Sequence, residues 1–272
     1  MKISIKLSDL ESLKRDIAEE YPEYGAGHRV EAIARGLGFN TYAHLRAQGT
    51  DRPISCDLNV EKFDFYLQGK PKAEDEQAKK SKRYTTLHPL WVAVIRLWIE
   101  DTLCRPEAAG LTEGGFYLNP KSKTYSEDFA RAKKEMLGHL QVSSFARSLE
   151  FLSRIKTTKR MLDSPRSYGQ KHHVERWWSS YGYEQTGENN YTYHGMYVLA
   201  AIHLGIKIKL EDGGPNCQLA VSGKSLAALE ERPNALEDKD LTDPSTWLTF
   251  FPTLPGFQEP TEGEDDLDKV WN

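Results

Sequence analysis

The sequence predicts a mostly α-helical protein with one small β-hairpin, an α+β fold in which a three-helix unit precedes a larger helical domain. Three observations carry this prediction. Apolar residues recur at helical spacing near the N-terminus and between residues 88 and 153. A glycine follows the apolar run 193–204, as at many helix ends. Two short alternating segments, 206–210 and 217–221, then flank a turn rich in Gly, Pro and Asn.

Length and composition place the chain among globular proteins without a membrane span. Its 272 residues, 39% of them apolar, are enough for one large domain or two modest ones. The longest apolar run, 90–99, is interrupted by Arg96 and is far shorter than the roughly 20 residues of a bilayer-spanning helix. The N-terminus has no apolar stretch of secretory length. We therefore expect a cytoplasmic protein.

The cysteines predict neither a disulfide framework nor a metal centre. Cys56, Cys104 and Cys217 are scattered and lack the paired spacing of zinc ligands, so we expect reduced thiols. No phosphate-cradling glycine loop is recognisable, because the turn 211–216 carries two acids and a proline where backbone donors are needed. The sequence predicts no cofactor and no metal.

Composition divides the chain into four segments. The stretch 69–83 is almost wholly polar and begins with glycine, as linkers and exposed charged helices do. Before it, apolar pieces at 53–58 and 63–67 fit either strands or a loop packed on the next domain. We predict a small helical unit at 1–50, a connecting segment with a charged linker at 51–83, a main helical domain at 84–258 that contains the hairpin 206–221, and a mobile acidic tail at 259–272.

The first 50 residues have the outline of a helix-turn-helix. We expect helices at 7–21, 28–36 and 41–48, with small Ala34 where the last two cross and Gly38 in the turn between them. A packing or docking module is the alternative, because any tight helical hairpin needs a small residue and a turn glycine. The candidate base-reading side chains are Asn40, Thr41, His44 and Arg46.

The run 28–42, His-Arg-Val-Glu-Ala-Ile-Ala-Arg-Gly-Leu-Gly-Phe-Asn-Thr-Tyr, resembles a short helical segment of mobile-element proteins labelled glyoxalase-related. The resemblance covers under a fifth of the chain. The metal-binding carboxylate and histidine pattern of glyoxalases is not recognisable here. The resemblance therefore implies no activity.

Three helices are expected in the first half of the main domain. The helix 88–103 has Pro89 in its first turn and apolar residues on more than one face, which predicts a central place in the core. Two further helices, 126–140 and 143–153, alternate Lys and Arg with apolar residues. Serines at the start of each, Ser143 and Ser144 in the second, are the expected N-caps.

Charge is distributed unevenly along the chain. Residues 121–176 carry 13 Lys and Arg against 6 Asp and Glu, whereas residues 211–272 carry 4 against 14. A basic block can be the electrostatic footprint of a nucleic-acid site, and an acidic tail can compete for that site. The alternative is a solvated helical face followed by a flexible tail.

The segment 164–222 concentrates the residues that could bind a partner. It combines Lys, His and Arg at 171–176 with eight aromatic residues within 168–197. If 170–180 is helical, cations and histidines form a ridge beside indole rings, which suits stacking on exposed bases with phosphate contacts alongside. The candidate nucleic-acid-binding residues are Lys171, His172, His173, Arg176, Trp177, Tyr193, His194 and, on the outer face of the hairpin, Lys207 and Lys209.

Other interpretations of this segment compete with binding. Trp177 and several tyrosines can fill a core. A metal site is disfavoured because the adjacent His172 and His173 would point about 100° apart on a helix. Nucleophilic catalysis by Ser167 lacks a supporting Gly-x-Ser-x-Gly elbow. We predict no catalytic residues.

Part of this segment is similar to a pattern in uncharacterised proteins of bacterial plasmids, prophages and integrative elements. The similar parts are Ser-Tyr-Gly-Gln-Lys-His-His-Val-Glu-Arg-Trp, then Tyr-His-Gly-Met-Tyr-Val-Leu-Ala-Ala-Ile-His-Leu-Gly-Ile, and Gly-Pro-Asn, all within 164–222. His194 departs from the pattern, in which asparagine more often precedes the glycine. The resemblance implies a mobile-element setting and no reaction.

The sequence therefore favours a non-enzymatic accessory protein of a mobile element that binds DNA or RNA through a basic, aromatic surface. The alternative partner is a protein, in which case the chain would be an adaptor or an inhibitor of a host defence complex. A metal-dependent hydrolase or nuclease that uses the His and Glu residues is the least favoured class.

Overall fold

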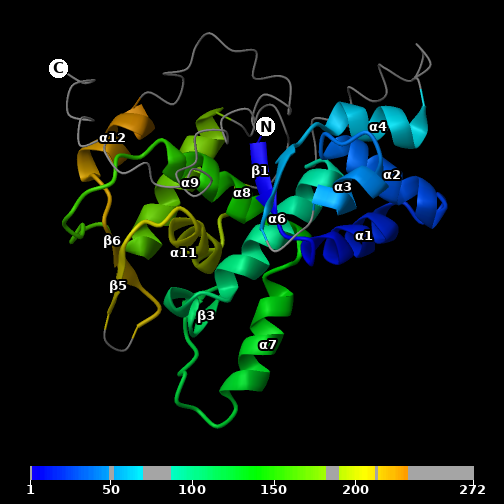
Figure 1. Cartoon of the computed structure of the whole chain (residues 1–272). Helices are drawn as coiled ribbons and strands as arrows, with labels where there is room; N and C mark the ends of the chain where they lie inside the picture. Colours follow the sequence, from blue (N-terminus) through cyan, green and yellow to red (C-terminus); the bar gives the residue numbers. More distant parts are fainter. Residues whose placement is uncertain (1, 49–51, 70–86, 182–189, 212–213, 232–272) are drawn as a thin grey trace.

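The computed structural model describes residues 2–48, 52–69, 87–181, 190–211 and 214–231 (Figure 1). In chain order its elements are β1 (Lys2–Ile5), α1 (Asp9–Glu20), α2 (Ala26–Gly36), α3 (Tyr42–Gln48), β2 (Ile54–Asp57), α4 (Val60–Gln68), α6 (Pro89–Leu103), the 3-10 turn η1 (Pro106–Ala108), β3 (Leu111–Thr112), β4 (Gly115–Phe116), α7 (Tyr125–Glu135), α8 (His139–Ser153), α9 (Ser167–Tyr181), α11 (His194–His203), β5 (Ile208–Leu210), β6 (Cys217–Leu219) and α12 (Gly223–Glu231).

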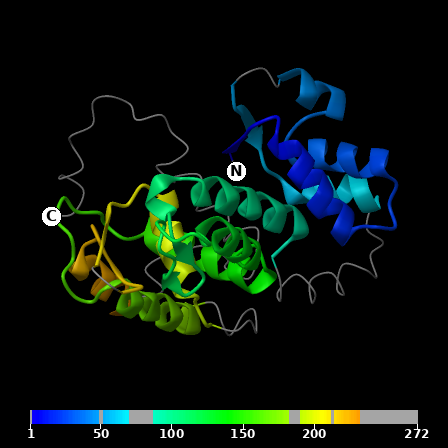
Figure 2. The same ribbon diagram turned by 90° about the horizontal axis from the view of Figure 1, so that it is seen from below.

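The predicted fold class is confirmed. Helices dominate, and the named strands pair as β1–β2, β3–β4 and β5–β6, each antiparallel. In both views α6 lies between the N-terminal elements and the elements from α8 onward (Figures 1 and 2). Within the described residues, no helix combines the length and the apolarity needed to cross a membrane.

The N-terminal elements include a small sheet, in which β2 confirms the strand alternative for 53–58 while β1 was not expected. In β1, Ile3 and Ile5 pair with Cys56 and Ile54 of β2, and all four side chains are buried. The predicted helices around α1, α2 and α3 are present. The β1–β2 pairing therefore ties the residues after position 52 to these helices.

The segment 63–67 is helical, so its interpretation as a strand or packed loop was wrong. The alternation Phe63, Phe65, Leu67 suggests a strand, but only Phe63 and Leu67 are buried, whereas Phe65 is exposed. This four-residue spacing is that of a helix face. Asn59 caps the helix α4, because its side-chain oxygen accepts a 2.8 Å hydrogen bond from the backbone N–H of Lys62.

The apolar helix predicted at 88–103 is α6, and it holds the centre of the core. Its first turn contains Pro89, and the Nδ1 of His88 accepts a 3.1 Å hydrogen bond from the backbone N–H of Leu90. The Nε2 of His88 lies 3.0 Å from the carboxylate of Asp64 in α4. These contacts join α4 to α6.

Two helix boundaries in the basic block differ from the prediction. The helix α7 ends at Glu135, and α8 begins at His139 after Gly138 as N-cap. Ser144, predicted to lie at the start of this helix, is buried within α8, and its Oγ accepts a 2.9 Å hydrogen bond from the backbone N–H of Tyr193. Of the residues 139–142 that the helix adds at its start, only Val142 is buried.

The last third of the described chain is built on the buried helix α11. This helix contacts α6, α8 and α9, and all ten of its residues are buried. It closes near Gly205, which has a positive φ of 70°. The predicted hairpin follows as β5 and β6, with Lys209 opposite Gln218. The predicted charged linker beyond Gly69 and the acidic tail 259–272 lie outside the described residues.

Candidate functional site

The helix α9 carries the predicted ridge, and its first turn is fastened to three other segments. The Oγ of Ser167 accepts a 2.9 Å hydrogen bond from the backbone N–H of Cys217 and lies 2.8 Å from the Nε2 of His194. The other ring nitrogen of His194 lies 3.0 Å from the carbonyl oxygen of Gly114. Ser167 is fully buried. This serine–histidine pair therefore joins α9, β6, α11 and the β3–β4 turn, and is closed off from solvent.

Protonation of His194 is disfavoured in this setting. Burial lowers the pKa of its imidazole, and the hydrogen bond with the Gly114 carbonyl opposes this only in part. A neutral ring with the proton on Nδ1 donates to Gly114, which leaves Nε2 as an acceptor for the hydroxyl of Ser167. The ring thereby satisfies both of its nitrogens within the fold.

Lys171 points inward, against a carboxylate and two tyrosine rings. Its Nζ lies 2.6 Å from Oε1 of Glu175, and the residue is only 1% exposed. The same ammonium lies 5.1 Å and 4.6 Å from the ring centroids of Tyr168 and Tyr191. The lysine is thus paired by charge and by cation–π contact within the protein.

Glu175 gathers the polar contacts of this region. Its carboxylate accepts hydrogen bonds from Lys171 and from the backbone N–H of Thr192 at 3.0 Å, and lies 2.5 Å from Nδ1 of His172. Burial alone would raise the pKa of the Glu175 carboxyl, but the hydrogen bonds from Lys171, Thr192 and His172 outweigh it and lower that pKa. The ionised carboxylate fastens the chain before α11 to α9.

The remaining residues predicted to bind nucleic acid differ in how far their side chains are exposed. Trp177 is 1% exposed and packs on Phe151 at 5.7 Å between ring centroids, which leaves no open ring face for a base. His172, His173 and Tyr193 are partly buried. Arg176, Lys207 and Lys209 are exposed. The ridge predicted along α9 is therefore not assembled as expected, because α9 turns Lys171 and Trp177 toward the core.

Lys207 and Lys209 belong to a different basic surface. The segment before α9 pairs with the end of β6 through the bridge between Thr157 and Val221. The backbone N–H of Thr158 donates to the carbonyl of Ala220, whose own N–H donates to the carbonyl of Lys207, each at 2.9 Å. Two segments, one on each side of the residues around Ala220, thus carry four exposed cations, which we name the basic strand cluster: Lys159, Arg160, Lys207 and Lys209.

None of the four side chains of the basic strand cluster makes an ion pair with the residues that the structure describes. The nearby Arg166, by contrast, pairs with Glu211. Lys159 and Arg160 were absent from the predicted site residues. The run Lys-Thr-Thr-Lys-Arg at 156–160 was the available signal, but its pairing with the residues after β6 depends on contacts distant in sequence.

All four candidate base-reading residues of the N-terminal unit are exposed: Asn40, Thr41, His44 and Arg46. The turn before α3 contains Gly38 with a positive φ of 89°, and Ala34 and Leu45 are buried between the helices. The Oγ1 of Thr41 accepts a 3.0 Å hydrogen bond from the backbone N–H of His44 and so caps α3. The helical hairpin therefore packs as its sequence predicts.

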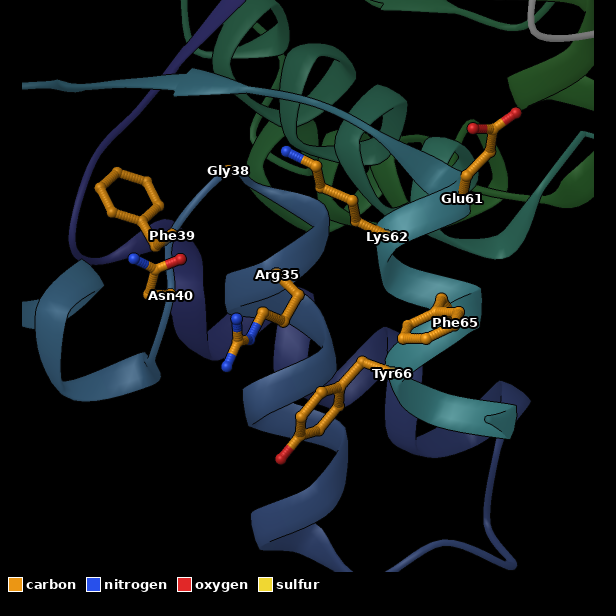
Figure 3. Close-up of a pocket in the computed structure, with 8 residues that line it drawn as sticks. All are labelled: Arg35, Gly38, Phe39, Asn40, Glu61, Lys62, Phe65 and Tyr66. Atoms are coloured by element: carbon orange, nitrogen blue, oxygen red, sulfur yellow. The ribbon is translucent and has the colours of Figure 1, made fainter. Parts of the chain in front are cut away.

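A groove opens between the α2–α3 turn and α4 (Figure 3). Its volume is about 590 Å³. The groove is lined by three aromatic side chains, one amide and two cations: Phe39, Phe65, Tyr66, Asn40, Arg35 and Lys62. Sequence reasoning singled out only Asn40, because the groove exists only once α4 packs beside α2.

Two of the three cysteines, Cys56 and Cys217, are buried, whereas Cys104 is exposed. Burial raises the pKa of the Cys217 thiol to about 12, so this thiol stays protonated at neutral pH. In the part of the chain that the structure describes, no three His, Cys, Asp or Glu side chains gather as metal ligands would.

No protein-family model matches the chain, and no curated protein and no solved structure matches it either.

Proposed function

We propose that this chain is a non-enzymatic protein that binds DNA or RNA, with the basic strand cluster at the centre of its phosphate-contacting surface. A setting in a mobile genetic element belongs to the same proposal and rests on the resemblance of residues 164–222. The proposal keeps Lys207 and Lys209 from the predicted surface. It adds Lys159 and Arg160, and it gives Lys171 and Trp177 a structural role.

The observation that carries the proposal is that four exposed cations on paired segments lack an acid partner in the described part of the chain, whereas several cations elsewhere in the chain have one. Lys171 pairs with Glu175, Arg154 with Glu150 and Arg131 with Asp128. The four cations of the basic strand cluster have no such acid among the described residues. Unpaired lysines and arginines that share one surface attract a polyanion, because each phosphate contact releases condensed counterions.

Strand geometry keeps Lys207 and Lys209 together. Residues two apart on a strand point to the same side, and the side chains on either side of Ile208 are both exposed. The antiparallel pairing with β6 holds this register. A backbone-tracking contact needs cations fixed along a line, and β5 with the residue before it provides two of them.

The proposal is tested by fluorescence anisotropy with labelled duplex DNA, single-stranded DNA and RNA of matched length at low salt. We expect Lys207→Ala/Lys209→Ala to weaken binding by about tenfold, since two phosphate contacts are lost. The matched control is Lys6→Ala/Lys14→Ala, because these lysines are already paired with Asp101 and Glu11. Absence of binding to all three nucleic acids would overturn the proposal.

Lys207→Ala/Lys209→Ala also shows whether the two lysines bind nucleic acid or prevent self-association of the protein. Lysines on an edge strand also prevent pairing between copies of a protein. If Lys207→Ala/Lys209→Ala binds nucleic acid as the unsubstituted chain does but forms larger assemblies in size-exclusion chromatography, the lysines protect the edge of β5. That outcome contradicts the proposed binding surface.

A further inference from the structure

The groove beside α4 contains a guanidinium that stacks on a tyrosine ring but makes no ion pair with the described residues. The Cζ of Arg35 lies 5.5 Å from the ring centroid of Tyr66. The Nε of Arg35 is buried and has no hydrogen-bond partner, and the side chain makes no ion pair with the described residues. A buried donor without an acceptor is costly, because its hydrogen bonds to water are lost and not replaced. The terminal nitrogens of Arg35 are not among the buried atoms, so a ligand with an anionic oxygen can pair with the guanidinium through them.

The other groove residues say what else such a ligand should contain. The side chain of Phe65 is 54% exposed, although it is large and apolar. Phe39 lies across the groove from it (Figure 3). An exposed aromatic ring beside a cation, as Phe65 is, suits a flat ring system, which stacks on it. Asn40 adds an amide that can both donate and accept hydrogen bonds.

The charges of the groove favour an anion. Arg35 and Lys62 are its two cations, and Glu61 is its one acid. Figure 3 shows the carboxylate of Glu61 directed away from the guanidinium of Arg35. A volume of about 590 Å³ lies within the roughly 300–1,000 Å³ typical of small-molecule sites. The groove is therefore large enough for one ring system with a charged substituent.

We propose that this groove binds a nucleotide, with the base stacked on Phe65 and the phosphate held by Arg35 and Lys62. Arginine suits this task because its planar fork donates two parallel hydrogen bonds to a phosphate. The nucleotide is supplied either as a free nucleoside monophosphate or as one unstacked residue of a single strand. The site does not depend on the basic strand cluster, which lies toward the other end of the molecule (Figures 1 and 2).

The test is isothermal titration calorimetry of the full chain with nucleoside monophosphates, the matching nucleosides, inorganic phosphate and a short single-stranded oligonucleotide. We expect a monophosphate or the oligonucleotide to bind with a Kd of about 1 mM or tighter. The matching nucleoside lacks the phosphate and should bind at least about tenfold more weakly than the monophosphate, because the charge-assisted hydrogen bonds to the phosphate are lost. Binding of the oligonucleotide alone identifies the single strand as the source, provided that this binding depends on Phe65.

Variants locate the binding within the groove. Phe65→Ala and Arg35→Ala should each weaken it about tenfold, through lost stacking and lost phosphate contact respectively. Lys62→Ala is the second cationic variant, because Lys62 is exposed and its loss leaves the packing of α2 unchanged. The controls are Tyr117→Ala and Arg131→Ala, an exposed aromatic residue and an exposed cation outside the groove.

The outcomes separate this site from the proposed function. Monophosphate binding that persists in Lys207→Ala/Lys209→Ala and disappears in Phe65→Ala supports the groove, whatever the basic strand cluster does. Failure of every monophosphate and of the oligonucleotide to bind would overturn the inference. Equal binding by Phe65→Ala, Arg35→Ala and the unsubstituted chain would overturn it as well.

Discussion

The ammonium of Lys171 lies 2.6 Å from the carboxylate of Glu175 and is buried beneath the rings of Tyr168 and Tyr191. The same carboxylate accepts the backbone N–H of Thr192. The pair therefore fixes the entry of the chain into α11, the helix around which the core is built. A cation that the sequence suggests for phosphate binding serves the fold instead.

This arrangement predicts that Lys171→Ala is a stability variant. Removal of one partner of a buried ion pair costs about 3–5 kcal/mol, because the other charge stays buried without compensation. We expect the free energy of unfolding, measured by urea denaturation, to fall by about 3 kcal/mol. At a temperature where the variant is folded, its affinity for nucleic acid should equal that of the unsubstituted chain. Unchanged stability with weakened binding would return Lys171 to the binding surface.

Gly195 allows α11 to approach the β3–β4 turn. Its backbone N–H donates a 2.7 Å hydrogen bond to the carbonyl of Glu113, and an added Cβ would lie 1.7 Å from the carbonyl oxygen of Thr112. We expect Gly195→Ala to lower the free energy of unfolding by about 3 kcal/mol or more, since backbone must move. Gly27→Ala is the matched helical control, because nothing lies within 4 Å of its added Cβ. If Gly27→Ala lowers the free energy of unfolding as well, the loss in Gly195→Ala comes from replacing a helical glycine and not from the close approach to Thr112.

His203 predicts how stability depends on pH. Burial lowers the pKa of its imidazole to about 4, beside the hydroxyl of Thr102 at 2.9 Å. Its usual pKa is about 6.5, so the unfolded chain binds the proton first as the pH falls. The stability that depends on a neutral His203 is complete above pH 6.5 and is lost between pH 6.5 and 4, by up to about 3 kcal/mol.

The measurement is urea denaturation at several pH values for the unsubstituted chain and His203→Gln. Over this range the free energy of unfolding should fall less steeply with decreasing pH in the variant. Burial raises the pKa of Glu150 to about 7, which has the opposite effect on stability, but Glu150 is present in both proteins and cancels in the comparison. Equal pH dependence in the two proteins would contradict the buried, neutral state of His203.

The N-terminal helical hairpin gives a separate prediction about DNA. The exposed side chains of α3 include His44 and Arg46. Since our proposal assigns phosphate contacts to the basic strand cluster, His44→Ala/Arg46→Ala should leave the affinity for duplex DNA unchanged. The measurement is the anisotropy titration described above. A loss of duplex affinity in this variant alone would identify α3 as a recognition helix.

The sequence was informative where local pattern decides structure. The alternation Ile206-Lys-Ile-Lys-Leu predicts a strand with exposed lysines. The strand β5 begins at Ile208, and both Lys209 within it and Lys207 just before it are exposed. The apolar stretch with Pro89 in its first turn predicts the central helix α6. The local pattern predicts the type of element in both cases, but not the buried side of β5, where the apolar Leu210 is 51% exposed.

The sequence was less informative where distant segments decide. Helical spacing in α9 gives the angles between Lys171, His172 and Trp177, but it does not say which side meets the core. Contacts with α8, α11 and α12 settle that, and they turn Lys171 and Trp177 inward. The groove at Phe65 likewise depends on the packing of α4 against α2, and the alternating pattern around Phe65 is typical of a strand.

The most direct test of the proposed binding surface is the salt dependence of duplex DNA affinity for the unsubstituted chain and for Lys207→Ala/Lys209→Ala. The slope of log K against log salt scales with the number of phosphates neutralised, at about 0.9 per contact. We predict that the double substitution reduces the magnitude of the slope by about 1.8, the value for two lost contacts. An identical slope in the two proteins would contradict the proposal.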